Sequence, residues 1–226
     1  RNYLWDLFID HGHEYHLYTY DKVEGIPEGV KVKDGNDILD KSEIFTYKNG
    51  SVSAFSNIFR FVLLYKKGGY WVDTDMICIR KLPFKENDIL FTSEPSSNYK
   101  KKIPTSSLIK APKNNKIILE GIKLLYELKK EILNGKITWG VGPHTIKKII
   151  ENNKLEGKIL DWKQTCSCYW GDYKSLFYPN NFSNNVIKNI NDIPESMYCI
   201  HLWNEMLRQG EIDKNGSYDK NSLYEQ

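Results

Sequence analysis

Two aspartates separated by one residue, Asp73 and Asp75, end an apolar run in the stretch GGYWVDTD. Side chains at positions i and i+2 of an extended segment point to the same side, so both carboxylates can face one ligand. Two like charges this close raise the cost of ionising each other, and a bound cation removes that cost. Mg²⁺ and Mn²⁺ are hard ions that bind carboxylates and substrate phosphates together. Taken alone, the pair favours a turn of two amide-bonded aspartates. Together with the polar helix face that precedes it, the pair indicates a divalent-metal site.

A row of polar residues precedes the aspartates on a helix predicted over residues 53–67. The apolar residues of this helix have the spacing of one buried face, namely Phe55, Ile58, Phe59, Val62 and Leu63. Ser53, Asn57 and Arg60 lie on the face away from the core, and Ser56 lies beside them. Packed next to the strand, this helix would bring Arg60 to a phosphate and Asn57 to a sugar hydroxyl. An exposed helical arginine is the ordinary alternative.

Two residues late in the chain, His201 and Trp203, follow the short apolar run at residues 197–200. An imidazole at the end of such a run can complete a metal site. The indole of Trp203 can cover phosphates or a sugar face. The alternatives are a partly buried structural histidine and a core tryptophan, and the aspartate pair favours the first interpretation of both residues.

The elements that must position these residues alternate along the chain. The patterns predict a helix over residues 3–9, a strand over 15–20, an irregular connection over 26–37, the helix over 53–67, strands over 70–72 and 76–79, a helix over 116–133 and a strand-like run over 197–200. This alternation favours one α/β layered domain over residues 1–226. Past Gly135 we expect irregular chain, in which the loop at residues 140–145 either offers amides to an anion before a helix near Thr145 or only connects.

The composition excludes several classes of function. The 226 residues carry a net charge of +3 with scattered lysines, so the sequence does not predict nucleic-acid binding. The sequence contains no run of about 18 apolar residues that would predict a membrane span. We therefore expect a cytoplasmic protein. The aromatic fraction of 13% suits ligand-binding walls. The four cysteines are expected to be reduced and mostly buried.

The segment SAFSNIFRFVLLYKKGGYWVDTDMICIRKLPF resembles the central block of glycosyltransferase family 32 and its relatives. These are transferases with a sugar-binding region that contains a DXD motif, related to α-1,4-N-acetylglucosaminyltransferases and α-1,6-mannosyltransferases. The resemblance extends to GHEYHLYTYD near the start and to IHLWNEMLRQGEIDKNGSYDKNSLYEQ at the end. It implies a GT-A fold, a Rossmann-like α/β sandwich, and a retaining transfer of sugar from a nucleotide-diphosphate donor, as in polysaccharide biosynthesis.

The resemblance also implies roles for individual residues. Asp73 and Asp75 match the DXD pair that holds Mn²⁺ or Mg²⁺ and the donor diphosphate or ribose. Arg60 matches a donor-contacting arginine on the preceding helix. His201 and Trp203 match a C-terminal His-x-Trp, in which the histidine closes the metal site and the tryptophan covers the diphosphate. A UDP-sugar is the favoured donor over a GDP-sugar, and the acceptor is a glycan or another hydroxyl compound.

The sequence departs from the family pattern at two places. Family members usually carry Ser-Asp before the arginine, and here the pair is Ser56-Asn57, which changes how donor hydroxyls are held. Members also have a strand before the first helix, and nothing of that type precedes Tyr3. These departures keep an alternative open, namely a non-catalytic nucleotide-sugar or glycan-binding module. A phosphatase of the haloacid-dehalogenase type also uses Asp-x-Asp, but on its first strand.

Overall fold

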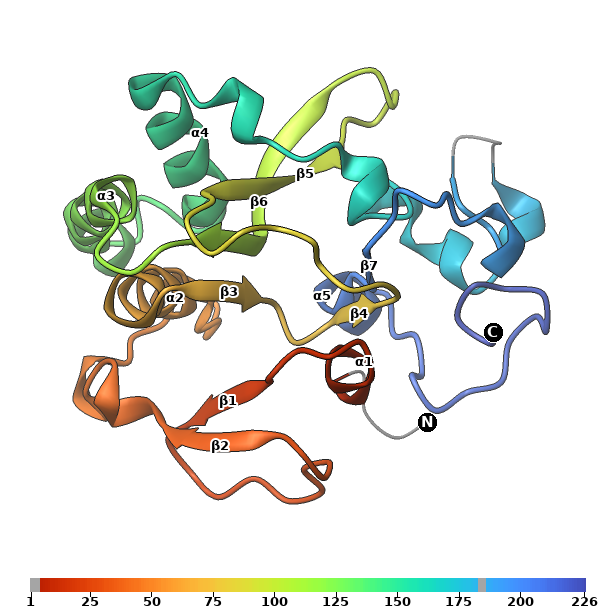
Figure 1. Cartoon of the computed structure of the whole chain (residues 1–226), viewed down its shortest axis with the longest axis horizontal. Helices are drawn as coiled ribbons and strands as arrows, with labels where there is room; N and C mark the ends of the chain where they lie inside the picture. The colour runs from red at the N-terminus through yellow and green to blue at the C-terminus, as the bar shows by residue number, and fades with distance from the viewer. Residues whose placement is uncertain (1–4, 183–185) are drawn as a thin grey trace.

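The computed structural model describes residues 5–182 and 186–226, and Figure 1 shows its mixed α/β architecture. The helices are α1 (Asp6–Asp10), α2 (Ser53–Lys67), α3 (Lys116–Leu133), α4 (Val141–Asn153) and α5 (Asn204–Gln209). The strands are β1 (His16–Thr19), β2 (Lys31–Asp34), β3 (Gly69–Val72), β4 (Met76–Cys78), β5 (Leu90–Pro95), β6 (Lys102–Ala111) and β7 (Cys199–His201). The α/β class predicted from the sequence is confirmed.

The strands form three small sheets. β1 pairs with β2 in parallel, and β6 lies between β3 and β5, antiparallel to both. β4 and β7 form an antiparallel pair although about 120 residues separate them in the sequence. This last pair joins the segment that follows the aspartates to the C-terminal segment that carries His201.

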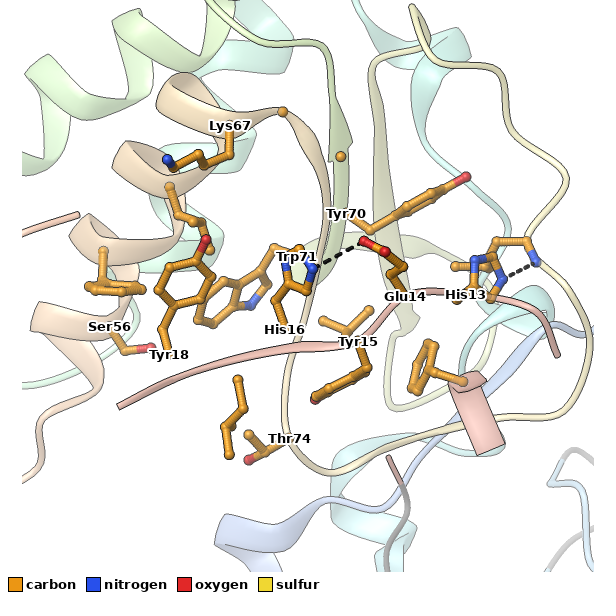
Figure 2. A pocket seen from close by; sticks show the side chains of 18 of the residues that line it. His13, Glu14, Tyr15, His16, Tyr18, Ser56, Lys67, Tyr70, Trp71 and Thr74 are labelled. Carbon is orange, nitrogen blue, oxygen red and sulfur yellow. Dashed lines mark hydrogen bonds and ion pairs between the residues drawn. The ribbon is translucent and has the colours of Figure 1, made fainter. Parts of the chain in front are cut away.

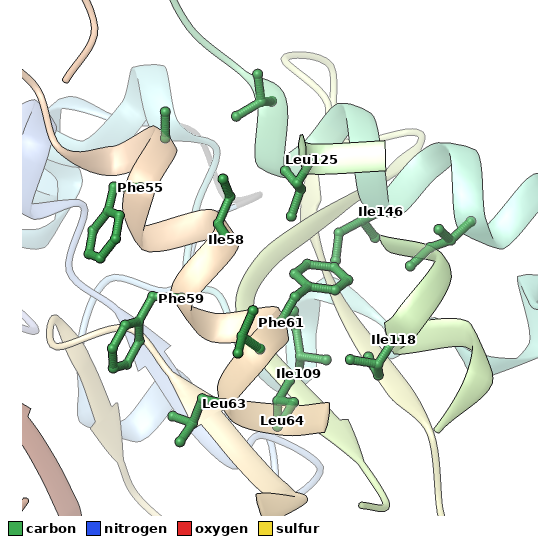
Figure 3. Close-up of a cluster of buried hydrophobic side chains, with 14 of the residues drawn as sticks. Phe55, Ile58, Phe59, Phe61, Leu63, Leu64, Ile109, Ile118, Leu125 and Ile146 are labelled. Carbon is green, nitrogen blue, oxygen red and sulfur yellow. The ribbon is translucent and has the colours of Figure 1, made fainter. Parts of the chain in front are cut away.

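α2 is the central helix of the largest apolar cluster. It packs against α3, α4 and β6, and Figure 3 shows Phe61 and Leu64 facing Ile118 and Ile146. α3 approaches very closely at Gly121, because a Cβ atom there would lie 2.2 Å from a ring carbon of Phe61. Any larger residue at this position would force the two helices apart.

Two residues of the polar row of α2, Asn57 and Arg60, are buried, which corrects one expectation. The apolar face is buried as predicted, but α2 is covered on its other side as well, so Arg60 is only 6% exposed and Asn57 only 7%. The row does not point away from the core. The apolar periodicity predicted one buried face of α2. The face that carries Asn57 and Arg60 is buried as well, because α4 and β6 pack against α2.

Most predicted elements are present, and one prediction is wrong. The strand over residues 15–20, the helices over 53–67 and 116–133 and the strands around the aspartates are confirmed. Residues 26–37 are not wholly irregular, because they contain β2, whose four residues are all exposed and therefore carry no apolar alternation. Of the residues before α1, only Trp5 is described, and it is not part of a strand; residues 1–4 lie outside the described part of the chain. α4 begins at Val141, four residues before the expected helix start.

Two further observations concern membrane spans and the cysteines. None of the helices in residues 5–182 and 186–226 combines the length and the apolar character needed to cross a bilayer. All four cysteines are buried, as predicted.

Candidate metal centre at the end of strand β3

A double-glycine turn delivers the chain from α2 into β3. Gly68 and Gly69 have φ angles of 72° and 90°, which residues with a Cβ atom rarely adopt. A Cβ atom at Gly68 would also lie 2.7 Å from the backbone nitrogen of Lys113. β3 then pairs with β6, and the Asp73 amide donates to the Ser107 carbonyl at 2.8 Å. Asp73 therefore stands where the strand leaves the sheet.

Pairing of β4 with β7 brings Asp75 to His201. The register places Met76 opposite His201, and the Leu202 amide donates to the Asp75 carbonyl at 3.0 Å. The His201 Nε2 atom lies 3.4 Å from Asp75 Oδ2, and the Asn204 amide donates to the same oxygen at 2.8 Å. The side chain of Asp75 is thus fixed from two directions.

Asp73, Asp75 and His201 offer three ligand atoms that lie within 4.8 Å of one another. Two carboxylate oxygens and one imidazole nitrogen suit Mn²⁺ or Mg²⁺ with water and phosphate as the remaining ligands. The three side chains keep 27%, 18% and 12% of their surfaces exposed, so an ion can reach them. The residues therefore fit the metal that the sequence predicts.

The electrostatics of the two carboxylates differ. Burial raises the pKa of Asp73, and the charge of Asp75 adds to this rise against the opposing effect of Arg60. Burial also acts on Asp75, but the charge and hydrogen bond of His201 outweigh it and lower the pKa of Asp75 to about 2. Burial would lower the pKa of His201, yet Asp75 raises it. A cation would relieve the repulsion between the two aspartates.

Arg60 lies beside Asp73 as the sequence predicted, but within the protein interior. Its Nη2 atom is 3.3 Å from Asp73 Oδ1, its Nη1 donates to the Ser106 carbonyl at 2.6 Å, and its guanidinium lies 4.8 Å from the centre of the Trp71 ring. Ser56 accepts a long bond of 3.4 Å from the same guanidinium. Arg60 thus compensates the charge of Asp73 and holds it in place.

Asn57 makes no hydrogen bond to the aspartates among the described residues. Its Nδ2 donates to the Ser53 carbonyl at 2.9 Å, and its buried Oδ1 has no hydrogen-bond partner among the described residues. A Cβ atom on Gly142 would lie 2.4 Å from this oxygen and 2.9 Å from Ser106 Oγ, so α4 covers the amide. The predicted approach of Asn57 to the strand end is not seen, while that of Arg60 is.

Trp203 follows β7 in a left-handed conformation, with φ 56°, and is 8% exposed. Its ring centre lies 4.1 Å from that of His201. The indole therefore packs on the imidazole and fixes its orientation.

Two further residues of the centre were not identified from the sequence. Trp71 donates from Nε1 to Asp73 Oδ1 at 2.7 Å, a contact that its i−2 position made foreseeable, and the backbone amide of Asn204 carried no sequence signal.

A cavity of about 580 Å³ lies next to the aspartates, between the edges of β1 and β3. Figure 2 shows Tyr15, Tyr18 and Trp71 around it, and Ser56 and Thr74 line it at the side of the metal ligands. Aromatic walls beside a few polar groups are typical of ligand sites.

Comparison with known proteins places these residues in a family. Residues 5–95 match the family described as "Glycosyltransferase sugar-binding region containing DXD motif". The matched segment contains Arg60, Asp73 and Asp75, whereas His201 and Trp203 lie beyond it. No curated protein sequence matches the chain significantly.

One solved structure similar to the chain is "PaToxG Glycosyltransferase", with 19% sequence identity and a TM-score of 0.42. The similarity covers 57% of this chain and 50% of that chain, so it spans about half the length of that protein. A likeness this distant identifies neither fold nor function. The mixed α/β architecture is consistent with a GT-A-like fold, and the Asp-x-Asp sequence within the matched residues 5–95 is Asp73-Thr74-Asp75. The family match of residues 5–95 supports a DXD-containing glycosyltransferase.

Proposed function

We propose that the protein is a metal-dependent, retaining glycosyltransferase that moves a sugar from a nucleotide-diphosphate donor to a hydroxyl group of a glycan or another acceptor. The observation that carries the proposal is the convergence of Asp73, Asp75 and His201 at the end of β3. The match of residues 5–95 to a sugar-binding region supports it.

Asp73, Asp75 and His201 would hold Mn²⁺ or Mg²⁺, which would neutralise negative charge on the leaving diphosphate. Around them, Trp71 and Arg60 fix the carboxylate of Asp73, and the Asn204 amide fixes that of Asp75. These supporting contacts hold the two acids in one orientation before the donor arrives, which lowers the cost of binding it.

The aromatic cavity between β1 and β3 suits the nucleoside of the donor. Tyr15, Tyr18 and Trp71 offer ring surfaces, and Thr74 connects the cavity to the aspartates. A UDP-sugar is the favoured donor and a GDP-sugar the second choice. In the transfer, the bond from the anomeric carbon to the diphosphate breaks and a bond to the acceptor oxygen forms on the same face. The acceptor proton leaves to a phosphate oxygen of the departing diphosphate.

The test is a thermal-shift screen of UDP-sugars and GDP-sugars, each with Mn²⁺ and with EDTA, followed by an assay of donor hydrolysis. We expect a Mn²⁺-dependent rise in the melting temperature with one donor and slow release of its sugar. Asp75→Asn should lose the rise, while Asp10→Asn, an exposed aspartate on α1, should retain it. Equal shifts with Mn²⁺ and EDTA would contradict the metal dependence.

A non-catalytic nucleotide-sugar or glycan-binding module is the second candidate. The observation that favours it is the burial of Asn57, at the position where the family resemblance implies a carboxylate. Such a module would give the same Mn²⁺-dependent thermal shift without any hydrolysis of the donor. The two measurements together therefore separate the two functions.

A further inference from the structure

Glu94 is an acidic residue on β5 that neither the family match nor the metal centre explains. β5 pairs with β6 so that Glu94 stands opposite Ile103, and Thr92 lies two residues earlier on the same face of the sheet. Thr92 Oγ1 lies 3.2 Å from Ser107 Oγ, and the Ser107 carbonyl accepts the Asp73 amide. β6 thus connects the strand that carries Glu94 to the strand end that carries Asp73.

The carboxylate of Glu94 is partly buried and has no hydrogen bond or ion pair within residues 5–182 and 186–226. Burial raises its pKa to about 6, and the charge of His201 acts in the opposite direction. A partly buried carboxylate without a partner destabilises a fold, so structural packing does not account for it. Its position relative to the metal centre follows from the sheet, in which β6 lies between β5 and the strand β3 that leads to Asp73.

The order of the strands decides which part of the donor Glu94 can meet. The aromatic cavity lies at one edge of β3, and none of its lining residues comes from β5, β6 or β7. β6 and then β5 lie on the other side of β3. If the nucleoside fills the cavity and the diphosphate lies at Asp73 and Asp75, the sugar must extend toward the side of β5.

We propose that Glu94 accepts a hydrogen bond from a hydroxyl group of the donor sugar and so helps to select that sugar. A carboxylate is an acceptor with two oxygens, and hydrogen bonds from hydroxyl groups to it are short and strong. The inference rests on the proposed function, because it needs a nucleotide-sugar at the metal centre. It assigns to this chain a sugar-binding group that the sequence analysis did not identify.

The test compares two ligands on the same protein, a nucleoside diphosphate and its sugar conjugate. Titrations use UDP and GDP, and the UDP-sugars and GDP-sugars of the screen, each with Mn²⁺. For Glu94→Ala we expect the Kd of the sugar conjugate to rise about tenfold or more, as for the loss of a hydrogen bond to a charged group. The Kd of the nucleoside diphosphate should change by less than about twofold. Glu94→Gln, which keeps an acceptor oxygen, should lie between the wild type and Glu94→Ala.

Glu127→Ala, an exposed glutamate on α3, is the matched control and should change neither affinity. Equal losses for the diphosphate and the conjugate in Glu94→Ala would show a structural role and overturn the inference. An unchanged affinity for every conjugate would overturn it as well. If the wild-type protein bound no diphosphate and no conjugate, the proposed function itself would fail. If the wild-type protein bound these ligands and Glu94→Ala bound them equally well, only the role of Glu94 would be refuted.

Discussion

Replacing Arg60 by methionine tests whether the buried ion pair holds the candidate metal centre together. The Arg60 side chain is 7% exposed and its guanidinium lies 3.3 Å from Asp73. Methionine fills much of the same volume without the charge. The substitution therefore leaves the carboxylate of Asp73 without its compensating cation and the Ser106 carbonyl without its donor.

The expected cost follows from the burial of the pair. Breaking a buried ion pair by removing one partner costs about 3–5 kcal/mol. Because the Asp73 side chain keeps 27% of its surface exposed, water screens part of this cost, and we expect about 3 kcal/mol. For a chain of this size that corresponds to a fall of roughly 6–12 °C in the melting temperature.

The assay is thermal and urea unfolding of Arg60→Met in EDTA and in Mn²⁺. We expect Mn²⁺ to recover part of the loss, because an ion at Asp73 replaces the missing positive charge. The double variant Arg60→Met/Asp73→Asn should be more stable than Arg60→Met alone, since it no longer buries an uncompensated carboxylate. Arg208→Met, which removes the exposed partner of Glu205, is the control and should leave the melting temperature unchanged. A loss below about 1 kcal/mol for Arg60→Met, or a double variant as unstable as the single one, would refute the reasoning.

The remaining predictions concern Asp75 and Asn57. Asp75→Ala should abolish the Mn²⁺-dependent thermal shift because it removes one of three ligand atoms, and an unchanged shift would contradict the metal site. The folded-state pKa of Asp75, about 2, lies below its ordinary value of 3.8, so its contribution of about 2 kcal/mol is present above pH 4 and lost as the pH falls toward 2. Acid unfolding in EDTA should therefore be shallower for Asp75→Asn between pH 4 and 2, and identical curves would argue against this pairing with His201. Asn57→Asp places a carboxylate in a site that is 7% exposed, where burial raises its pKa, so the variant should lose stability relative to the wild type as the pH rises above about 4, the pKa of an unperturbed aspartate. The same variant should alter donor turnover or preference, and if neither stability nor turnover changed, Asn57 would have no special role in the site.

Local sequence patterns were sufficient where neighbouring residues determine the structure. The apolar spacing of α2 and its Lys-Lys-Gly end fixed the helix over Ser53–Lys67, and the double glycine fixed the turn into β3. The Asp-x-Asp pair indicated a metal site from the side-chain geometry of an extended segment. In the structure, Thr74 and Asp75 instead form a turn, in which the Met76 amide donates to the Asp73 carbonyl at 3.1 Å. The turn, and not strand alternation, therefore brings the two carboxylates together. The strand β2 was missed because its exposed residues, Lys31–Asp34, follow no apolar alternation and are held only by pairing with β1.

The sequence by itself predicted that two carboxylates share one site and placed Arg60 on the helix before them. Only the tertiary structure decided what lies around them. His201 reaches Asp75 because β7 pairs with β4, which lies about 120 residues earlier in the sequence. No local sequence pattern encodes such a pairing. Asn57 shares a helix face with Arg60, but its amide lies against α4 and makes no contact with the aspartates among the described residues. Helical periodicity specifies the direction of a side chain around its own axis, whereas the elements packed on that face decide whether it meets a ligand, a neighbouring charge or the core.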